Sequence, residues 1–147
     1  MIAIEVRGLP APQGSKRHVG RGVMVESSKA VGPWREAVRG QTQTVRVLRD
    51  RGPLTGPLKV NLDFYLPRPK GHYGTGRNAG QVRPSAPRYP AWRPDLDKLT
   101  RATLDGLTMG AAWVDDCQVV EIITCKLYAT QQMPPGCCIS IDDLEEL

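Results

Sequence analysis

The chain has 147 residues, a length that fits one domain, and a formal net charge of +5 at pH 7. No stretch approaches the roughly 18 apolar residues that a membrane-spanning helix needs, and charged residues interrupt the apolar N-terminus. We therefore expect neither a membrane span nor a signal peptide. The four cysteines form no C-x-x-C pair and only two histidines are present, which argues against a structural zinc site and predicts reduced thiols in a cytoplasmic protein.

The net charge conceals two oppositely charged parts. Residues 1–93 hold 17 Lys and Arg against 5 Asp and Glu, whereas residues 94–147 hold 3 against 10. A basic part favours a polyanion partner, because neutralising phosphates releases counterions, although a solvated basic surface has the same composition. Carboxylates beside phosphates would weaken a purely electrostatic DNA binder, whereas a metal-dependent nuclease requires them. The two parts together favour a nuclease.

A strand, a basic loop and a helix are predicted first along the chain. Residues 2–7 alternate apolar and polar side chains, which predicts a half-buried strand. A polar loop over residues 13–22 follows. Ser27 or Ser28 is a candidate cap for a helix that ends near Arg49, and a start at Pro33 stays open. The apolar members of this helix are Trp34, Val38, Val45 and Leu48.

The most regular alternation in the sequence lies at residues 58–66, which predicts an amphipathic strand. Residues 67–93 then combine prolines and glycines with Arg and Lys and with the aromatics Tyr73, Tyr89 and Trp92. A long loop of this kind is usually functional or disordered. Basic residues interleaved with aromatics suit a flap that contacts nucleic acid, while a mobile insertion without a role is the alternative.

The remaining elements complete an α+β domain. An apolar stripe predicts a helix over residues 96–107, and β-branched residues predict a strand over about 118–128. A turn at residues 133–136 reverses the chain before a last strand over 137–141, and residues 142–147 form an acidic tail. The order predicts a single domain over residues 1–147, with a small mixed or antiparallel sheet of about four strands and two main helices.

Asp95 and Asp97 are the first candidate catalytic residues. Two helical residues with this spacing lie roughly 200° apart and would not easily share a metal ion. If Asp95 is extended or caps the helix, both carboxylates reach the same side, although capping alone is also an ordinary role for Asp95. Arg101 follows Asp97 by one helical turn and would reach the same site.

A second pair, Asp115 and Asp116, precedes a predicted strand. A helix start and a strand start joined by a short connection are expected to lie side by side, which would bring this pair to Asp95 and Asp97. Converging carboxylates repel one another without a cation, and Mg²⁺ prefers hard oxygen ligands. We therefore predict a Mg²⁺ site, with Mn²⁺ as a possible substitute. Asp105, on the polar face of the helix, is expected to be solvated.

These residues form two linked motifs. Residues 93–107 read R-P-D-L-D-K-L-T-R-A-T-L-D-G-L, and residues 113–121 read W-V-D-D-C-Q-V-V-E, with Lys126 after them. This pattern resembles the RusA family of Holliday junction resolvases, whose motif is close to P-D-x-D-N-L-x-K-x-x-x-D-A-L, followed by D-D-x-Q-V and a later lysine. Arg101 stands where the family usually has a catalytic lysine, and Lys98 replaces the usual asparagine.

The resemblance implies a small homodimer that nicks four-way junctions symmetrically with a divalent metal, in DNA recombination or repair, in a bacterial or phage-infected cell. It implies that Asp95, Asp97 and Asp116 are the essential carboxylates, with Asp115 beside them. Arg101 would contact the scissile phosphate, although arginine cannot donate a proton at neutral pH. The predicted DNA contacts are Lys16, Arg17, Arg21, Lys70, Arg77, Arg93, Lys98 and Lys126.

Two other functions stay open from the sequence. One is a branched-DNA-binding protein that is catalytically weak or inactive, which the arginine at position 101 favours. The other is a nuclease that acts on flaps and other branched DNA, because junction shape is read by dimer geometry. The chain has no glycine-rich Walker loop, so we expect no nucleotide cofactor.

Overall fold

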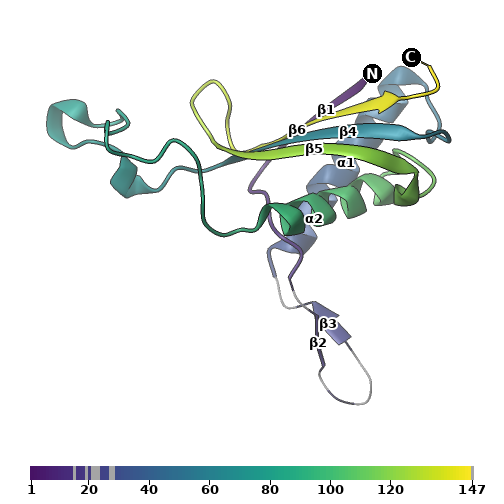
Figure 1. The fold of residues 1–147 in the computed structure, drawn as a ribbon, viewed down its shortest axis with the longest axis horizontal. Coiled ribbons are helices and arrows are strands. Elements are labelled where there is room, and N and C mark those ends of the chain that lie inside the picture. Colours follow the sequence, from purple (N-terminus) through teal and green to yellow (C-terminus); the bar gives the residue numbers. More distant parts are fainter. Residues whose placement is uncertain (15, 19, 21–23, 27–28, 147) are drawn as a thin grey trace.

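This computed structural model describes residues 1–14, 16–18, 20, 24–26 and 29–146, and a mixed sheet of four strands forms its centre (Figure 1). The strands are β1 (Ile2–Arg7), β4 (Leu58–Leu66), β5 (Val119–Tyr128) and β6 (Gly136–Asp143), in the spatial order β1-β6-β4-β5. β6 is antiparallel to β1 and β4, whereas β4 and β5 are parallel. The predicted α+β domain with a small mixed sheet and two main helices is confirmed.

β4 is the central strand of the core. Its alternate residues Leu58, Val60, Leu62 and Phe64 are fully buried, and the residues between them are half-buried on the other face of the sheet. Complete burial of each such side chain stabilises the fold by about 1.5–3 kcal/mol. The predicted amphipathic strand over residues 58–66 is therefore confirmed, and its apolar face shows which side of the sheet the helices cover.

Helices α1 (Val31–Arg49) and α2 (Leu96–Met109) pack on that side of the sheet and against each other (Figure 1). The buried Trp34 indole Nε1 donates to Thr103 Oγ1 at 3.1 Å and joins the two helices. Leu48, an apolar member of the predicted helix, is 80% exposed and does not join the core. The last turn of α1 extends past the end of α2 at Gly110, so nothing packs over Leu48 there. No described helix is long and apolar enough to cross a membrane.

The chain before α1 differs from the predicted loop. Residues 16–18 and 24–26 form a two-stranded antiparallel ladder, β2 (Lys16–His18) with β3 (Met24–Glu26). The candidate caps Ser27 and Ser28 lie outside the described residues. α1 begins at Val31 after Ala30, whose side chain makes no capping hydrogen bond.

α2 connects β4 to β5 and runs antiparallel to β5. Parallel neighbouring strands require such a crossover, because a tight turn joins only antiparallel strands. Near its middle, α2 touches β5 through the hydroxyls of Thr100 and Thr124, whose oxygens lie 3.1 Å apart. The turn after β5 does reverse the chain, but β6 pairs with β4 and β1 and not with β5. β6 also includes Asp142 and Asp143, which the sequence assigned to the acidic tail.

The segment 67–93 extends beyond the end of the sheet (Figure 1). It contains two single-turn 3₁₀ helices, η1 (Lys70–His72) and η2 (Gly76–Asn78), and isolated bridges that pair Tyr73 with Val82 and Gly74 with Ala79. Most of its residues are exposed. The segment therefore has local structure, and its role as a DNA-contacting flap stays a prediction.

The four cysteines are free thiols, in agreement with the predicted reduced state. Burial raises the pKa of the Cys137 thiol well above its usual value. Burial, and then the hydrogen bond that Cys125 donates to the Asp63 carboxylate, raise the pKa of Cys125 to about 11. Both thiols therefore stay protonated, and poorly nucleophilic, at neutral pH.

The contact between α1 and α2 depends on Gly106. A Cβ at this position would lie 2.8 Å from Val38 Cβ and 3.1 Å from the Arg35 carbonyl oxygen. We predict that Gly106→Ala lowers the free energy of unfolding by about 1–3 kcal/mol, because overpacking separates the helices. Urea unfolding followed by circular dichroism measures this change.

Gly40→Ala is the matched control, since Gly40 lies within α1 and a Cβ there meets no atom within 4 Å. This variant is expected to raise the free energy of unfolding by about 0.4–1 kcal/mol through reduced backbone entropy of the unfolded chain. Equal stabilisation by both substitutions would contradict the close helix contact.

Candidate active site

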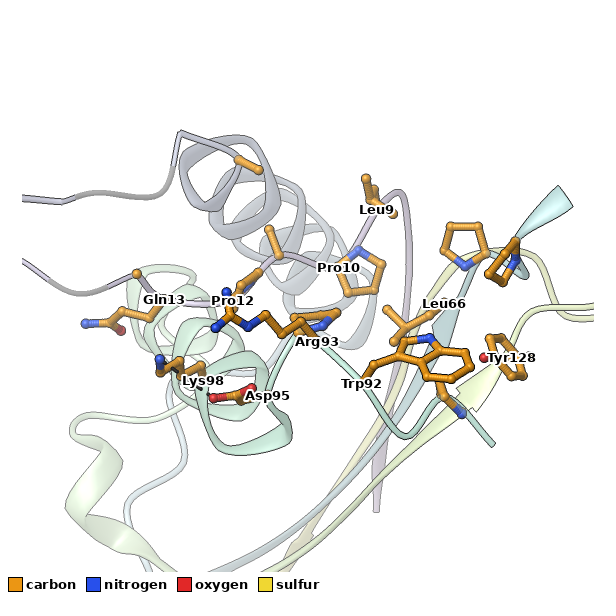
Figure 2. Close-up of a pocket in the computed structure, with 17 residues that line it drawn as sticks. Leu9, Pro10, Pro12, Gln13, Leu66, Trp92, Arg93, Asp95, Lys98 and Tyr128 are labelled. Carbon is orange, nitrogen blue, oxygen red and sulfur yellow. Dashed lines mark ion pairs between the residues drawn. The ribbon is translucent and has the colours of Figure 1, made fainter. Parts of the chain in front are cut away.

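The first aspartate pair lies at the start of α2. Asp95 occupies the N-cap position with extended backbone (φ −70°, ψ 137°), and its side chain makes no capping hydrogen bond. The extended conformation is the alternative under which Asp95 and Asp97 can face the same side. Asp95 Oδ2 instead lies 3.7 Å from Lys98 Nζ, an exposed ion pair that Figure 2 marks. Among the described residues, no hydrogen bond or ion pair engages the Asp97 carboxylate.

Lys126 holds the approach to α2 in place. Its Nζ donates to the carbonyl oxygens of Trp92 at 2.7 Å and Pro94 at 2.9 Å, so the end of β5 is tied to the residues on either side of Arg93. The backbone N–H of Gln13 donates to the carbonyl of Lys98 at 3.1 Å and joins a third segment. Lys126, predicted as a DNA contact, thus directs its ammonium at backbone oxygens and orients the site.

The second aspartate pair lies in a short turn before β5. η3 (Asp116–Gln118) is capped by Asp115, whose Oδ1 accepts from the Cys117 N–H at 2.9 Å. Gln118 completes the capping box, because its Oε1 accepts from the N–H groups of Val114 and Asp115. Sequence reasoning missed this role of Gln118, although an Asp followed three residues later by Gln is the signature of a capping box. One carboxylate oxygen of Asp115 is therefore used by the turn.

The pKa values of the Asp115 and Asp116 carboxyls are shifted in opposite directions. The backbone N–H of Cys117 hydrogen-bonds the Asp115 carboxylate and lowers its pKa. Partial desolvation raises the pKa of Asp116, followed by its hydrogen bond with Asp115 and the nearby charges of Asp115 and Asp105. The Arg101 guanidinium acts in the opposite direction and favours ionised Asp116. Asp116 is therefore the weaker acid of the two, and a nearby cation would lower its pKa.

Asp105, which the sequence predicts to be solvated, has a partly exposed side chain and also belongs to this second group. Its carboxylate lies 3.4 Å from the Arg35 guanidinium, and it lines an open groove of about 550 Å³ together with Asp115 and Asp116. The spacing of Asp105 from Asp97 and Arg101 is the sequence signal that could have assigned it to the site. Asp97, Arg101 and Asp105 follow one another at four-residue intervals and therefore share one side of α2.

The structure does not bring all the aspartates together. Within the described part of the chain, no three or more His, Cys, Asp or Glu side chains form a group that could hold a metal ion. The expectation that the helix start meets the strand start fails because α2 and β5 are antiparallel. The start of β5 lies near the C-terminal half of α2, where Asp105 and Asp116 interact. Arg101 lies between the pairs, one turn after Asp97 and close enough to Asp116 to affect its pKa.

The predicted DNA contacts fall in several places. Lys70 in η1 and Arg77 in η2 are exposed on the segment 67–93. Arg93 and Lys98 line a cavity of about 710 Å³ that also contacts Asp95 (Figure 2). Lys16 and Arg17 belong to β2, and Arg21 lies outside the described residues; nothing further is described for these three side chains. Two cations of the predicted set therefore adjoin the first aspartate pair.

Comparison with known proteins identifies one family. The family model described as endodeoxyribonuclease RusA matches residues 7–141. No curated protein matches the chain significantly. The matched range includes both aspartate pairs, Arg101 and Lys126, and it covers nearly all 147 residues. The chain therefore belongs to the RusA endodeoxyribonuclease family.

Proposed function

We propose that this protein is a metal-dependent endonuclease that resolves four-way DNA junctions by paired, symmetric nicks during recombination or repair. The observation that carries this proposal is the line of Asp97, Arg101 and Asp105 along α2, with Asp95 at one end and Asp116 at the other. It occurs in a member of an endodeoxyribonuclease family. Carboxylates for a metal and a cation for a phosphate are the groups that phosphodiester hydrolysis requires.

The donor chemistry fits Mg²⁺, with Mn²⁺ as a substitute. The Asp95 side chain makes no capping hydrogen bond, Asp97 is exposed, and the pKa of Asp116 is raised, a shift that a nearby cation would reverse. We assign Asp95 and Asp97 as ligands at the start of α2 and Asp116, with the second oxygen of Asp115, as ligands before the start of β5, so that the two pairs would serve one or two ions. A bound Mg²⁺ would stabilise charge on the phosphate oxygens and activate water for hydrolysis.

Arg101 would bind the scissile phosphate. Its guanidinium offers several N–H donors in one plane, and this geometry matches two phosphate oxygens at once. It stays charged at all working pH values, so the proton for the leaving oxygen must come from water or another group. Arg93, Lys98, Lys70 and Arg77, with the basic residues of β2, would hold the arms of the junction.

A homodimer would supply two such sites. β5 is an edge strand, and Val120, Ile122 and Ile123 on it are 64%, 40% and 52% exposed. Exposed apolar residues on an open edge favour pairing with another chain. A two-fold axis between the chains would match the symmetry of a four-way junction.

Cleavage of a synthetic four-way junction, next to a linear duplex and a flap substrate, tests the proposal in Mg²⁺, Mn²⁺ and EDTA. Paired nicks that require metal and occur only in the junction are expected. Equal cutting of the flap would identify a broader branched-DNA nuclease. Tight binding without cutting in either metal would favour the binding-only function to which the arginine at position 101 points.

Asp97→Asn is expected to reduce junction cleavage by at least roughly 100-fold, because metal-assisted charge stabilisation contributes several kcal/mol. Junction affinity in EDTA should be kept, since no base or phosphate contact is lost. Single-turnover cleavage and gel-shift titration measure the two quantities. Asp142→Asn, which removes a carboxylate on β6 outside both pairs, is the control and should cut normally. Near wild-type cleavage by Asp97→Asn would exclude Asp97 from the metal site.

Arg101→Ala is expected to lower the rate of cleavage by roughly 100- to 1000-fold, the usual effect of removing one donor to a developing negative charge. Arg101→Lys keeps the cation at the position where the family usually has lysine and should retain more than a tenth of wild-type activity. If the two variants lose activity equally, a positive charge at position 101 does not by itself support catalysis.

Asp116 should release its proton at higher pH than Asp115 in the metal-free protein. Carbon-13 NMR of the aspartate carboxyls measures both midpoints. Asp115→Asn removes the neighbouring charge but keeps a capping side chain, so the pKa of Asp116 should fall. Added Mg²⁺ should also lower this midpoint, because a cation favours the ionised form. An Asp116 midpoint that Mg²⁺ leaves unchanged would exclude this residue as a ligand.

A further inference from the structure

The cavity beside Asp95 has walls from five separate parts of the chain. It opens where the parallel strands β4 and β5 end, and the segments after β1 and before α2 close its sides (Figure 2). Its volume of about 710 Å³ lies in the range of small-molecule sites, which is roughly 300–1000 Å³. Nothing in the proposed hydrolysis uses this space, although it adjoins the first aspartate pair.

One end of the cavity is apolar and aromatic. Leu66, Trp92 and Tyr128 stand there (Figure 2). The Trp92 indole is 50% exposed, whereas Trp34 and Trp113 are 2% and 1% exposed in the core. A half-exposed indole at the edge of an apolar cavity can stack against a flat ligand, and every nucleobase has such a face.

Tyr128 adds a polar group without a partner. The residue is only 6% exposed, and its hydroxyl finds no hydrogen-bond partner among the described residues. The Arg68 guanidinium, 4.1 Å from the ring centre, and the edge-on His72 ring at 5.5 Å fix the ring, and the hydroxyl points toward Trp92 (Figure 2). Gln13 also lines the cavity, but its amide points away from the aromatic end (Figure 2). An unpaired buried polar atom is costly, so the Tyr128 hydroxyl favours a ligand with a polar edge.

The other end of the cavity is charged. Arg93 and Lys98 line it together with Asp95, and two cations suit the phosphate of a nucleotide. Lys126 holds the backbone on both sides of Arg93, so the cationic end and the aromatic end have a defined separation along one short segment. An aromatic wall, an unpaired hydroxyl and nearby cations together match one nucleotide whose base has left the stack.

We propose that this cavity binds one unstacked nucleobase of the DNA, next to the nucleotide whose phosphate is cut. The base stacks on Trp92, the Tyr128 hydroxyl hydrogen-bonds its edge, and Arg93 and Lys98 hold its phosphate. The inference rests on the proposed function, because that function makes branched DNA the ligand. A base inside a duplex must first be unpaired, and this cost is smallest where stacking is already interrupted. The cavity therefore favours branched over linear DNA.

The test pairs substitutions at Trp92 with junctions that lack one base. Binding is measured in EDTA, where no cutting occurs, for an intact four-way junction and for junctions with a single abasic site at each position near the branch point. Trp92→Phe keeps an aromatic face, whereas Trp92→Leu keeps only apolar bulk. Trp92→Leu should weaken binding of the intact junction by roughly 5- to 150-fold, the effect of losing one stacked base, and Trp92→Phe should weaken it by much less.

At one abasic position the loss caused by Trp92→Leu should disappear, because the base that stacks on Trp92 is already absent. Val82→Ala, which removes an exposed side chain of the same segment outside the cavity, should bind all these junctions like the wild type. An equal loss from Trp92→Leu at every abasic position, or no loss with the intact junction, would overturn the proposal.

Tyr128→Phe gives a second readout. The hydroxyl contacts no described protein group, so its removal should leave the free energy of unfolding unchanged or slightly higher. It should nevertheless weaken junction binding by roughly 2- to 10-fold, and only when the base is present. A loss of stability without loss of affinity would assign the hydroxyl to the fold and contradict the base site. Cleavage in Mg²⁺ is measured separately. If the effect of Trp92→Leu depends on one base but the protein does not cut, the proposed hydrolysis is wrong and the base site stands.

Discussion

The parallel pairing of β4 with β5 is the constraint from which the arrangement of the site follows. Parallel neighbours need a crossover connection, and α2 makes it across the apolar face of the sheet. α2 therefore runs antiparallel to both strands. Its N-terminus lies where β4 and β5 end, and its C-terminus lies where β5 begins. The residues on either side of α2, although close in sequence, are separated by the length of this helix.

Because of this separation, the two groups of carboxylates have their own local partners. Asp95 has Lys98 one turn away, and the start of a helix favours its negative charge. Asp115 accepts a backbone N–H, and Asp116 retains a proton more strongly than an ordinary aspartate. Arg35 meets Asp105. Arg101 lies between the two groups and lowers the pKa of Asp116, and under the proposed function the arginine at this position, where the family usually has lysine, would take part in the chemistry.

The same crossover creates the cavity beside Asp95. The chain must leave β4, extend through residues 67–93 and return to the start of α2, so its return leg passes over the ends of both parallel strands. Lys126, near the end of β5, binds the carbonyls of Trp92 and Pro94 and fixes that leg. Trp92 in the aromatic wall and the Asp95 carboxylate, a proposed metal ligand, are thereby joined by three consecutive peptide units. Recognition of a base and hydrolysis of a phosphate would then share one rigid element.

The local pattern of the sequence determined the strand over residues 58–66, the two main helices and both aspartate pairs, because alternation and helical periodicity act between near neighbours. The extended backbone of Asp95 was also among the alternatives, since the preceding proline disfavours an earlier helical start. The pairing of β6 with β4, the exposure of Leu48, the ion pair of Asp105 with Arg35 and the unpaired Tyr128 hydroxyl were decided by tertiary structure. Each depends on which segments distant in sequence meet, and side-chain spacing along one element carries no information about the element that packs against it.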